Sequence, residues 1–251
     1  MIFFLIAVLG LIFGSFLNVI IYRLPKKESI VFPGSKCPKC GIPINWYHNI
    51  PLLSFIYLKG KTFCCNQNIS FRYPIVELLS MFLWIWGYFY LDGFINQFFF
   101  IIIASCLLSI FFTDLNHYYI PLELNVLIFI SALTNYLVID SYDLKFHFYS
   151  MISITIYFLV IMLLSSYLLK KETMGYGDII LIAVISFWVG FIDSLLVIFF
   201  ASLFSIIHWL ILRVSSNKKN DIILPFGSTL ALAVLIIFIL KNTLHIETNF
   251  F

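Results

Sequence analysis

The chain has 251 residues, of which 62% are hydrophobic and 11% charged, with a mean hydropathy of +1.04. Soluble domains are roughly 45–50% apolar and about 25% charged, so this composition excludes a water-soluble globule. It also excludes a disordered chain, which would be poor in hydrophobic residues. A helix that spans a bilayer needs about 20 apolar residues. We therefore expect an all-α polytopic integral membrane protein in a lipid bilayer.

Long apolar runs with few charges follow one another along the whole chain. They cover residues 1–22, 74–91, 93–113, 118–139, 146–170, 179–192, 194–212 and 222–240. The sixth run is short, and the second and fourth each contain a glutamate, so we expect eight spans and keep seven as an alternative. The predicted parts of the chain are a first transmembrane helix (1–22), a loop domain (23–73), a seven-helix membrane domain (74–240) and a short tail (241–251).

Lysine and arginine are distributed unevenly between the two sides of these spans. The segment 23–72 carries eight of them, and five more follow the fifth and seventh runs, whereas Lys145 and Lys241 alone fall on the opposite side. Because positive residues stay in the cytoplasm, the N-terminus is expected outside and the long loop inside. The first run has no basic segment before it, so we expect a retained span rather than a cleaved signal peptide. The net charge of +3 reflects this topology and does not indicate a nucleic-acid partner.

Acidic residues of the apolar runs fall on one side of the predicted membrane. They are Glu77, Asp114, Glu123 and Asp178, all at the cytoplasmic boundary. One such residue can lie at the end of a span simply because water is there. A charge at the bilayer centre costs at least ~2.5–3.5 kcal/mol, and acids near membranes often face a water-filled cavity with a function. Four acids on one side favour the functional interpretation.

Two carboxylates that meet in such a cavity share a proton. One can then act as a general base on water and the other as a general acid, which is the chemistry of aspartic proteases. Asp114 and Asp178 are the candidate catalytic pair. Their spacing alone does not show that they meet, and a proton-coupled transporter would use similar acids.

Asp178 closes the segment Met174-Gly-Tyr-Gly-Asp178 at the start of the sixth run. Gly175 and Gly177 permit a close backbone approach and unusual backbone angles at this point. The alternative is an ordinary turn that starts a helix, with Asp178 as its N-cap.

Four cysteines lie in the long loop, as Cys37-Pro-Lys-Cys40 and the adjacent pair Cys64 and Cys65. A reducing cytoplasm disfavours disulfides, and this pattern predicts a tetrahedral Zn²⁺ site. The first pair has good spacing for a metal, whereas adjacent cysteines seldom reach the same ion. His48 is an alternative fourth ligand, and a reduced loop with partial affinity for metal is the alternative to a zinc site.

Several short sequence blocks are more informative together than any one motif is alone. They read Gly14-Ser-Phe-Leu-Asn18, Cys37-Pro-Lys-Cys40, Trp46-Tyr-His-Asn49-Ile-Pro51, Arg72-Tyr-Pro-Ile-Val-Glu77, Thr113-Asp114, Met174-Gly-Tyr-Gly-Asp178 and Pro225-Phe-Gly227. In this order, over nearly the whole chain, the sequence resembles bacterial prepilin peptidases. These are the type IV leader peptidases of the Gly-x-Gly-Asp group of membrane aspartic proteases.

The resemblance implies an enzyme with two activities. It would remove the basic leader of type IV prepilins or pseudopilins after a glycine, at the cytoplasmic face of the bacterial inner membrane. It would then methylate the new N-terminus with S-adenosylmethionine. The resemblance makes Asp114 and Asp178 catalytic. Candidate supporting or substrate-binding residues are Asn18, Glu77, Glu123, Gly175 and Gly177. For Asn18 the alternative is a hydrogen bond between two spans.

Three departures from the family pattern affect what can be carried over. The family's second Cys-x-x-Cys aligns with Thr62 and Cys65, so Cys64 would have to replace a ligand. Asn116 stands where the family usually has another aspartate, and Ile180 where it usually has a lysine. The aspartate pair itself is intact, so the departures affect the metal site and methyl transfer. Two other functions stay open: an inactive assembly factor that binds pilins, and a proton-coupled transporter.

Overall fold

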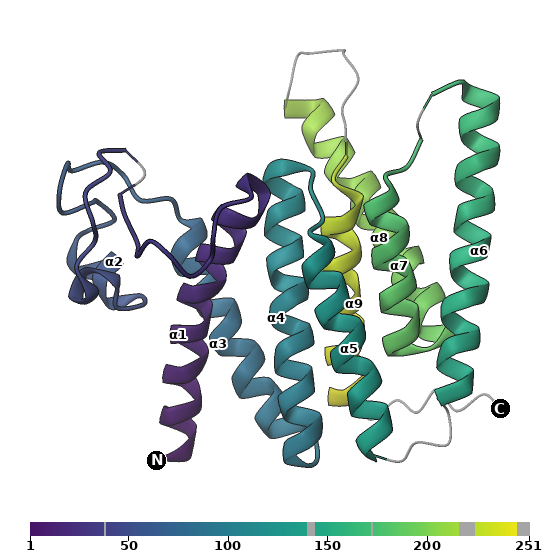
Figure 1. Cartoon of the computed structure of the whole chain (residues 1–251), viewed down its shortest axis with the longest axis horizontal. Helices are drawn as coiled ribbons and strands as arrows, with labels where there is room; N and C mark the ends of the chain where they lie inside the picture. The colour runs from purple at the N-terminus through teal and green to yellow at the C-terminus, as the bar shows by residue number, and fades with distance from the viewer. Residues whose placement is uncertain (38, 140–143, 172, 216–223, 245–251) are drawn as a thin grey trace. The chain divides into compact units, whose positions relative to one another are not determined.

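The apolar runs predicted from the sequence are helices in the computed structural model, which describes residues 1–37, 39–139, 144–171, 173–215 and 224–244. The long helices are α1 (Ile2–Arg23), α3 (Arg72–Tyr90), α4 (Phe94–His117), α5 (Leu122–Ile139), α6 (Leu144–Leu169), α7 (Tyr176–Val189), α8 (Phe191–Ser215) and α9 (Phe226–Thr243) (Figure 1). The described residues contain two isolated bridges and no longer strand. The all-α prediction is therefore confirmed.

Six of these helices are long and apolar enough to cross a membrane, namely α1, α4, α5, α6, α8 and α9. The chain is thus a multi-pass membrane protein, and the count of eight spans stays a prediction. Helix α7 has 14 residues, which gives about 21 Å of helix against a hydrocarbon core of about 30 Å. It ends before Gly190, whose φ of +83° favours glycine and turns the chain into α8.

The residues group into two compact units, Met1–Gln97 and Phe98–Phe251. The finer division at residues 22, 73 and 240 stays a prediction. Of the predicted tail 241–251, the first residues belong to α9, and residues 245–251 lie outside the described part.

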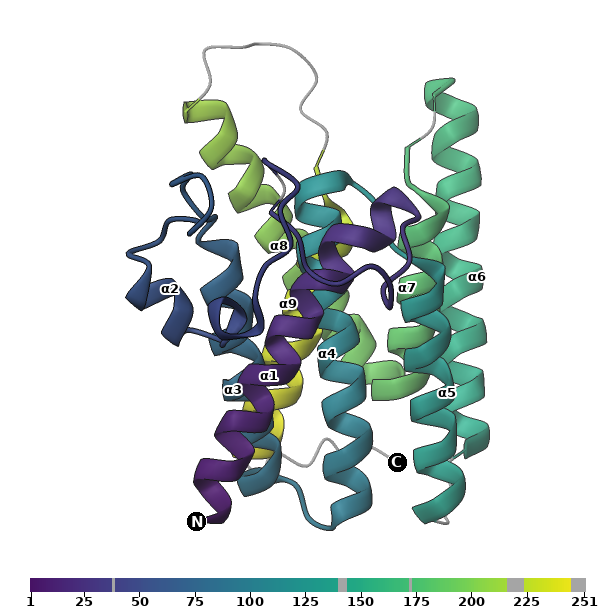
Figure 2. The ribbon, with the colours of Figure 1, turned by 60° about the vertical axis from the view of Figure 1, so that its left-hand side comes forward.

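In the first unit α1 packs along α3, and the two lie side by side in Figures 1 and 2. Gly10 and Gly14 make this close crossing possible, since a Cβ on Gly14 would lie 2.6 Å from the Cα of Glu77. Ser80 of α3 donates a hydrogen bond of 2.8 Å to the carbonyl of Gly10. The crossing fixes the register in which polar residues of α1 and α3 face each other.

The segment between α1 and α3 has little regular structure. It contains two 3₁₀ turns, η1 (Leu24–Lys26) and η2 (Trp46–Asn49), and the short helix α2 (Leu53–Tyr57). Arg23 is buried at the start of this segment, and its guanidinium donates to the carbonyls of Ser29, Pro33 and Gly34. Arg23 therefore folds the beginning of the loop onto the end of α1.

In the second unit the short helix α7 packs against α5, α6, α8 and α9. Leu181, Ile182 and Phe187 of α7 are almost completely buried. Near the end of α7, an ion pair of 2.6 Å joins Asp193 of α8 to Lys241 of α9. The other end of α7 begins with Tyr176 and Gly177 and carries Asp178.

Candidate active site

Asp114 lies in the last turns of α4 and is 5% exposed. One of its carboxylate oxygens, Oδ2, accepts a hydrogen bond of 2.6 Å from the backbone N–H of Ser228. Ser228 belongs to the first turn of α9, where backbone N–H groups have no partner within the helix. The N-terminus of a helix also carries a partial positive charge, so it suits an anion.

Asp178 lies in the first turn of α7, and its side chain reaches the same helix end. Its carboxylate interacts electrostatically with the carboxylate of Asp114 and with the backbone N–H groups of Gly175 and of Gly227, the residue before Ser228. Two consecutive N–H groups of α9 therefore hold the two carboxylates. The structure brings together the pair that the spacing of the sequence could not join.

Glycines make this approach possible. A Cβ on Gly227 would clash with Cδ1 of Ile120 and lie 3.2 Å from Oδ2 of Asp114. A Cβ on Gly177 would lie 3.3 Å from Cβ of Ile120, and one on Gly175 would lie 3.2 Å from Oδ2 of Asp178. Close approach is confirmed as the reason for these glycines. Unusual backbone angles are not, since Gly175 has an ordinary extended conformation (φ −75°) and none of the three has a positive φ.

Gly175 is the N-cap of α7, and its carbonyl accepts the N–H of Asp178 at 3.1 Å. The N-cap position expected for Asp178 is therefore wrong. Glu123 lies exposed in the first turn of α5, and among the described residues no hydrogen bond joins it to the aspartates. Asn116 bonds within α4, to the carbonyl of Phe112.

Gly227 and Ser228 were not among the predicted site residues, because they act through backbone N–H groups that any residue except proline has. The available signal was Pro225-Phe-Gly227 in front of an apolar run, since proline and glycine at a helix start indicate an exposed set of N–H groups.

Glu77 and Asn18 lie in the first unit, at the crossing of α1 and α3. Glu77 is 7% exposed, and its Oε2 accepts the N–H of Leu52 at 2.9 Å. The Nδ2 group of Asn18 donates to the carbonyl of Tyr73 in α3 at 3.1 Å, and to that of Gly14 at 3.3 Å. Asn18 thus makes a hydrogen bond to the neighbouring helix α3, as its alternative role required, although the bond uses only the Nδ2 group of the amide; that α3 is a span stays a prediction.

The four loop cysteines form one cluster, in which all Sγ atoms lie within 4.8 Å of one another. Sγ of Cys40 lies 3.2 Å from Sγ of Cys64, and Sγ of Cys37 lies 3.8 Å from Sγ of Cys65. Sulfurs bound tetrahedrally at about 2.3 Å from a zinc ion would be ~3.8 Å apart. These residues therefore fit a metal ion such as Zn²⁺.

Although adjacent cysteines seldom reach the same metal ion, Cys64 and Cys65 both place their sulfurs in this cluster. They lie on a tight turn in which the N–H of Thr62 donates to the carbonyl of Gln67, and Asn66 has a φ of +54°. The turn points both sulfurs toward the first pair. His48 is not in the cluster and lies against the ring of Phe63 instead.

The thiols of this cluster differ in acidity. A hydrogen bond from the backbone N–H of Cys40 lowers the pKa of Cys37 to about 6. Hydrogen bonding with the sulfur of Cys40 raises the pKa of Cys64 to about 12. At neutral pH the metal-free cluster therefore holds a thiolate next to a thiol, which gives a cation a first ligand.

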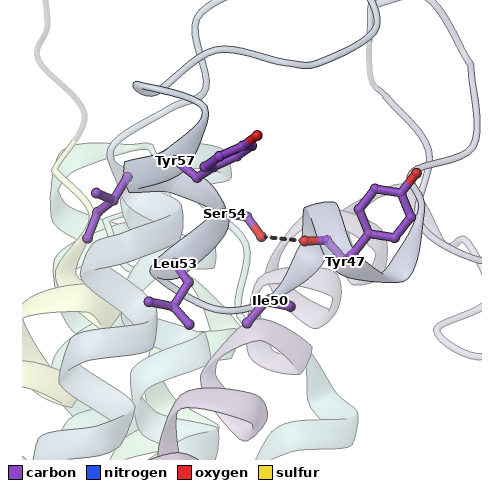
Figure 3. A pocket seen from close by; sticks show the side chains of 6 residues that line it. Tyr47, Ile50, Leu53, Ser54 and Tyr57 are labelled. Carbon is purple, nitrogen blue, oxygen red and sulfur yellow. Dashed lines mark hydrogen bonds between the residues drawn. The ribbon is translucent and has the colours of Figure 1, made fainter.

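A cavity of about 460 Å³ lies between η2 and α2 in the same loop (Figure 3). Its lining is mostly apolar and consists of Tyr47, Ile50, Leu53, Ser54, Ile56 and Tyr57. Ser54 closes one side by donating to the carbonyl of Tyr47 at 3.2 Å.

Comparison with known proteins gives the same division of the chain. Residues 8–91 match the bacterial peptidase A24 N-terminal domain, and residues 101–210 match the type IV leader peptidase family. No solved structure matches the chain significantly.

Similar proteins cover the chain almost end to end. A prepilin leader peptidase/N-methyltransferase of Neisseria gonorrhoeae is 30% identical over 98% of the chain and 93% of that protein. The protein of that name in Vibrio cholerae is 32% identical over 93% of the chain and 95% of that protein. The one in Klebsiella pneumoniae is 36% identical over 72% of the chain and 82% of that protein. The chain therefore belongs to the type IV leader peptidase family, a family of aspartic peptidases.

Proposed function

We propose that the chain removes the leader peptide of type IV prepilins or pseudopilins and methylates the new N-terminus. One observation carries the peptidase proposal: the start of α9 binds the carboxylate of Asp114 through the N–H of Ser228, and the carboxylate of Asp178 interacts with Asp114 and with the N–H of Gly227 at the same helix end. The names of the relatives support both activities, since each is a prepilin leader peptidase/N-methyltransferase. Asp114 and Asp178 are the proposed catalytic residues.

The pair would work as one unit that shares a proton. The ionised carboxylate takes a proton from a water molecule, whose oxygen attacks the carbonyl carbon of the scissile bond. The protonated carboxyl gives its proton to the carbonyl oxygen, and the leaving nitrogen then takes up a proton as the C–N bond breaks. Gly227 and Ser228 keep the two carboxylates in place through these changes of charge.

We assign the active site to the cytoplasmic face of the bacterial inner membrane, with the N-terminus outside. The distribution of lysine and arginine supports this orientation, because thirteen of fifteen fall on the side of the long loop. Asp114 near the end of α4 and Asp178 at the start of α7 would then face the side on which a pilin leader is made.

We propose that Cys37, Cys40, Cys64 and Cys65 hold a structural Zn²⁺ ion. A site with four protein ligands leaves no open position for a substrate, so the ion would cross-link the loop rather than take part in hydrolysis. S-adenosylmethionine would supply the methyl group for the trimmed N-terminus.

The test uses purified protein in detergent with a full-length prepilin, followed by the mass of the pilin. We expect loss of the leader, a further gain of ~14 Da when S-adenosylmethionine is added, and no leader loss with the double variant Asp114→Asn/Asp178→Asn. Glu123→Gln is the matched control, because it removes an exposed carboxylate that makes no bond to the pair. Intact prepilins with a correctly folded wild-type protein would contradict the proposal and favour a pilin-binding assembly factor.

A further inference from the structure

A second buried carboxylate, Glu77, takes no part in the aspartate site. It is 7% exposed, accepts the N–H of Leu52, and has the side chain of Ser15 within hydrogen-bonding reach. In the described part of the chain, no nitrogen of lysine, arginine or histidine lies within 4.0 Å of it. An ionised carboxylate that is buried without a cation is unfavourable, so a positively charged partner beside Glu77 would stabilise its charge.

The two arginines at this end of the helices do not supply that partner. Arg23 gives its guanidinium to three loop carbonyls. The guanidinium of Arg72 lies over the ring of Tyr73, 5.0 Å from its centre. Glu77 is therefore left with backbone and hydroxyl groups.

Beside Glu77, the side-chain amide oxygen of Asn18 is a buried hydrogen-bond acceptor that no described donor reaches. Both groups next to its Nδ2 are carbonyls, of Gly14 and Tyr73, so the orientation of the amide is determined. Among the described residues its Oδ1 then has no hydrogen-bond partner, although Asn18 is only 2% exposed. A buried acceptor without a donor is as unfavourable as a lost hydrogen bond.

The helix crossing places these two groups near each other. Gly14 of α1 meets Glu77 of α3, Asn18 lies one turn further along α1, and Tyr73 lies one turn before Glu77. One helical turn is about 5.4 Å. The carboxylate and the free amide oxygen are thus within the reach of one small cationic group.

The loop beside Glu77 is held in a strained form. Leu52 has φ +57° and ψ −47°, a conformation that a residue with a bulky side chain rarely adopts. Such strain is characteristic of binding and catalytic sites. Leu53, the next residue, lines the apolar cavity between η2 and α2 (Figure 3). The buried carboxylate and the cavity therefore lie on either side of one strained turn.

We propose that Glu77 and Asn18 form a binding site for an organic cation that serves methyl transfer. This inference depends on the proposed methyltransferase activity. Leader cleavage acts on a neutral amide, whereas both reactants of the methylation bind as cations: the α-ammonium of the trimmed pilin, and S-adenosylmethionine with its sulfonium and ammonium groups. In the transfer the ammonium first loses one proton to water, the neutral nitrogen then forms the N–CH3 bond as the S–CH3 bond breaks, and S-adenosylhomocysteine leaves. An anion and a free acceptor are what either cation requires.

The test is Glu77→Gln in the full-length protein, because glutamine keeps an oxygen for the N–H of Leu52 and removes only the charge. We expect leader cleavage within about twofold of the wild type, and methylation of a trimmed pilin lower by ~10–100-fold, the loss typical of a charge-assisted contact. A raised KM for the pilin alone identifies the ammonium, and a raised KM for S-adenosylmethionine, with weaker binding in calorimetry, identifies the methyl donor. Glu28→Gln, the same change at an exposed carboxylate of the loop, is the control and should leave both reactions unchanged.

The outcomes separate this inference from the proposed function. Methylation at the wild-type rate in Glu77→Gln overturns the cation site and leaves the peptidase intact. An equal loss of cleavage and methylation also overturns it, because Glu77 would then only support the fold. If the wild type cleaves prepilin but neither methylates nor binds S-adenosylmethionine or trimmed pilin, the site has no cation to bind and the inference fails. If the wild type does not cleave prepilin at all, the proposed function itself fails.

Discussion

Gly227 is the residue at which a single methyl group tests the geometry of the aspartate site. In Gly227→Ala the new Cβ would clash with Cδ1 of Ile120, and would lie 3.0 Å from Cγ1 of Ile120 and 3.2 Å from Oδ2 of Asp114. The first contact is impossible without movement, so either Ile120 rotates or the start of α9 shifts. If α9 shifts, the N–H groups that face the carboxylates move with it, and if Ile120 rotates, Oδ2 of Asp114 must still give by a few tenths of an ångström.

The cost of this change should fall on activity more than on stability. Alanine is about 1 kcal/mol better than glycine within a helix, which offsets part of the ~1–3 kcal/mol expected from overpacking. A displacement of 1 Å in a catalytic arrangement costs about 10²-fold in rate. We therefore expect Gly227→Ala to lower prepilin cleavage by ~10-fold, with a free energy of unfolding within about 2 kcal/mol of the wild type.

Cleavage rates and thermal unfolding in detergent measure the two effects separately. The double variant Gly227→Ala/Ile120→Ala removes the two closest contacts and should regain part of the activity, a coupling that a double-mutant cycle quantifies. Gly34→Ala is the control, because no atom of the described residues lies within 4 Å of its Cβ position and its φ is not positive. Wild-type cleavage by Gly227→Ala would refute the role given to the start of α9.

Two other parts of the chain allow further predictions. Removal of metal with a chelator, or Cys37→Ser, should make the loop 23–72 sensitive to proteases and should slow methyl transfer before it slows cleavage. Equal protease sensitivity with and without metal would argue against a structural ion. In the metal-free loop the pKa of Cys37 is lowered from 9.0 to about 6, so the contribution of Cys37 to stability grows from pH 6 to 9. The pKa of Cys64 is raised from 9.0 to about 12, so the contribution of Cys64 is lost above pH 9. Protection of the metal-free loop from proteolysis should therefore be greatest near pH 9, and a steady decline from pH 6 upward would contradict these shifts. Lys241→Met should break the partly buried pair with Asp193 and lower the unfolding free energy by ~1 kcal/mol without changing cleavage, and an unchanged Tm would show that the pair contributes nothing.

The helices could be predicted because hydropathy alone determines where a chain can cross a bilayer. Their ends could not, because they depend on local backbone conformation. The sixth run was expected at 179–192, whereas α7 begins at Tyr176 after its cap Gly175 and ends at Val189 before Gly190.

The part of the site that side chains form could be predicted from the sequence, and the part that backbone groups form could not. Asp114 and Asp178 stand out as acids in apolar runs, but the groups that join them are backbone N–H groups of Gly227 and Ser228. The cysteine cluster was underestimated for a similar reason, because a positive φ at Asn66 directs the turn that carries Cys64 and Cys65.

The most direct test of the central claim is the rate of leader removal by Asp114→Asn and Asp178→Asn, each as a single variant in detergent, with the mass of the pilin as the readout. Asparagine keeps the size and the oxygen that accepts the N–H of α9, and removes only the ability to exchange a proton. The account predicts that each variant folds like the wild type and loses ~10²–10⁴-fold in rate. Cleavage at the wild-type rate by either variant would show that the two aspartates are not the catalytic pair.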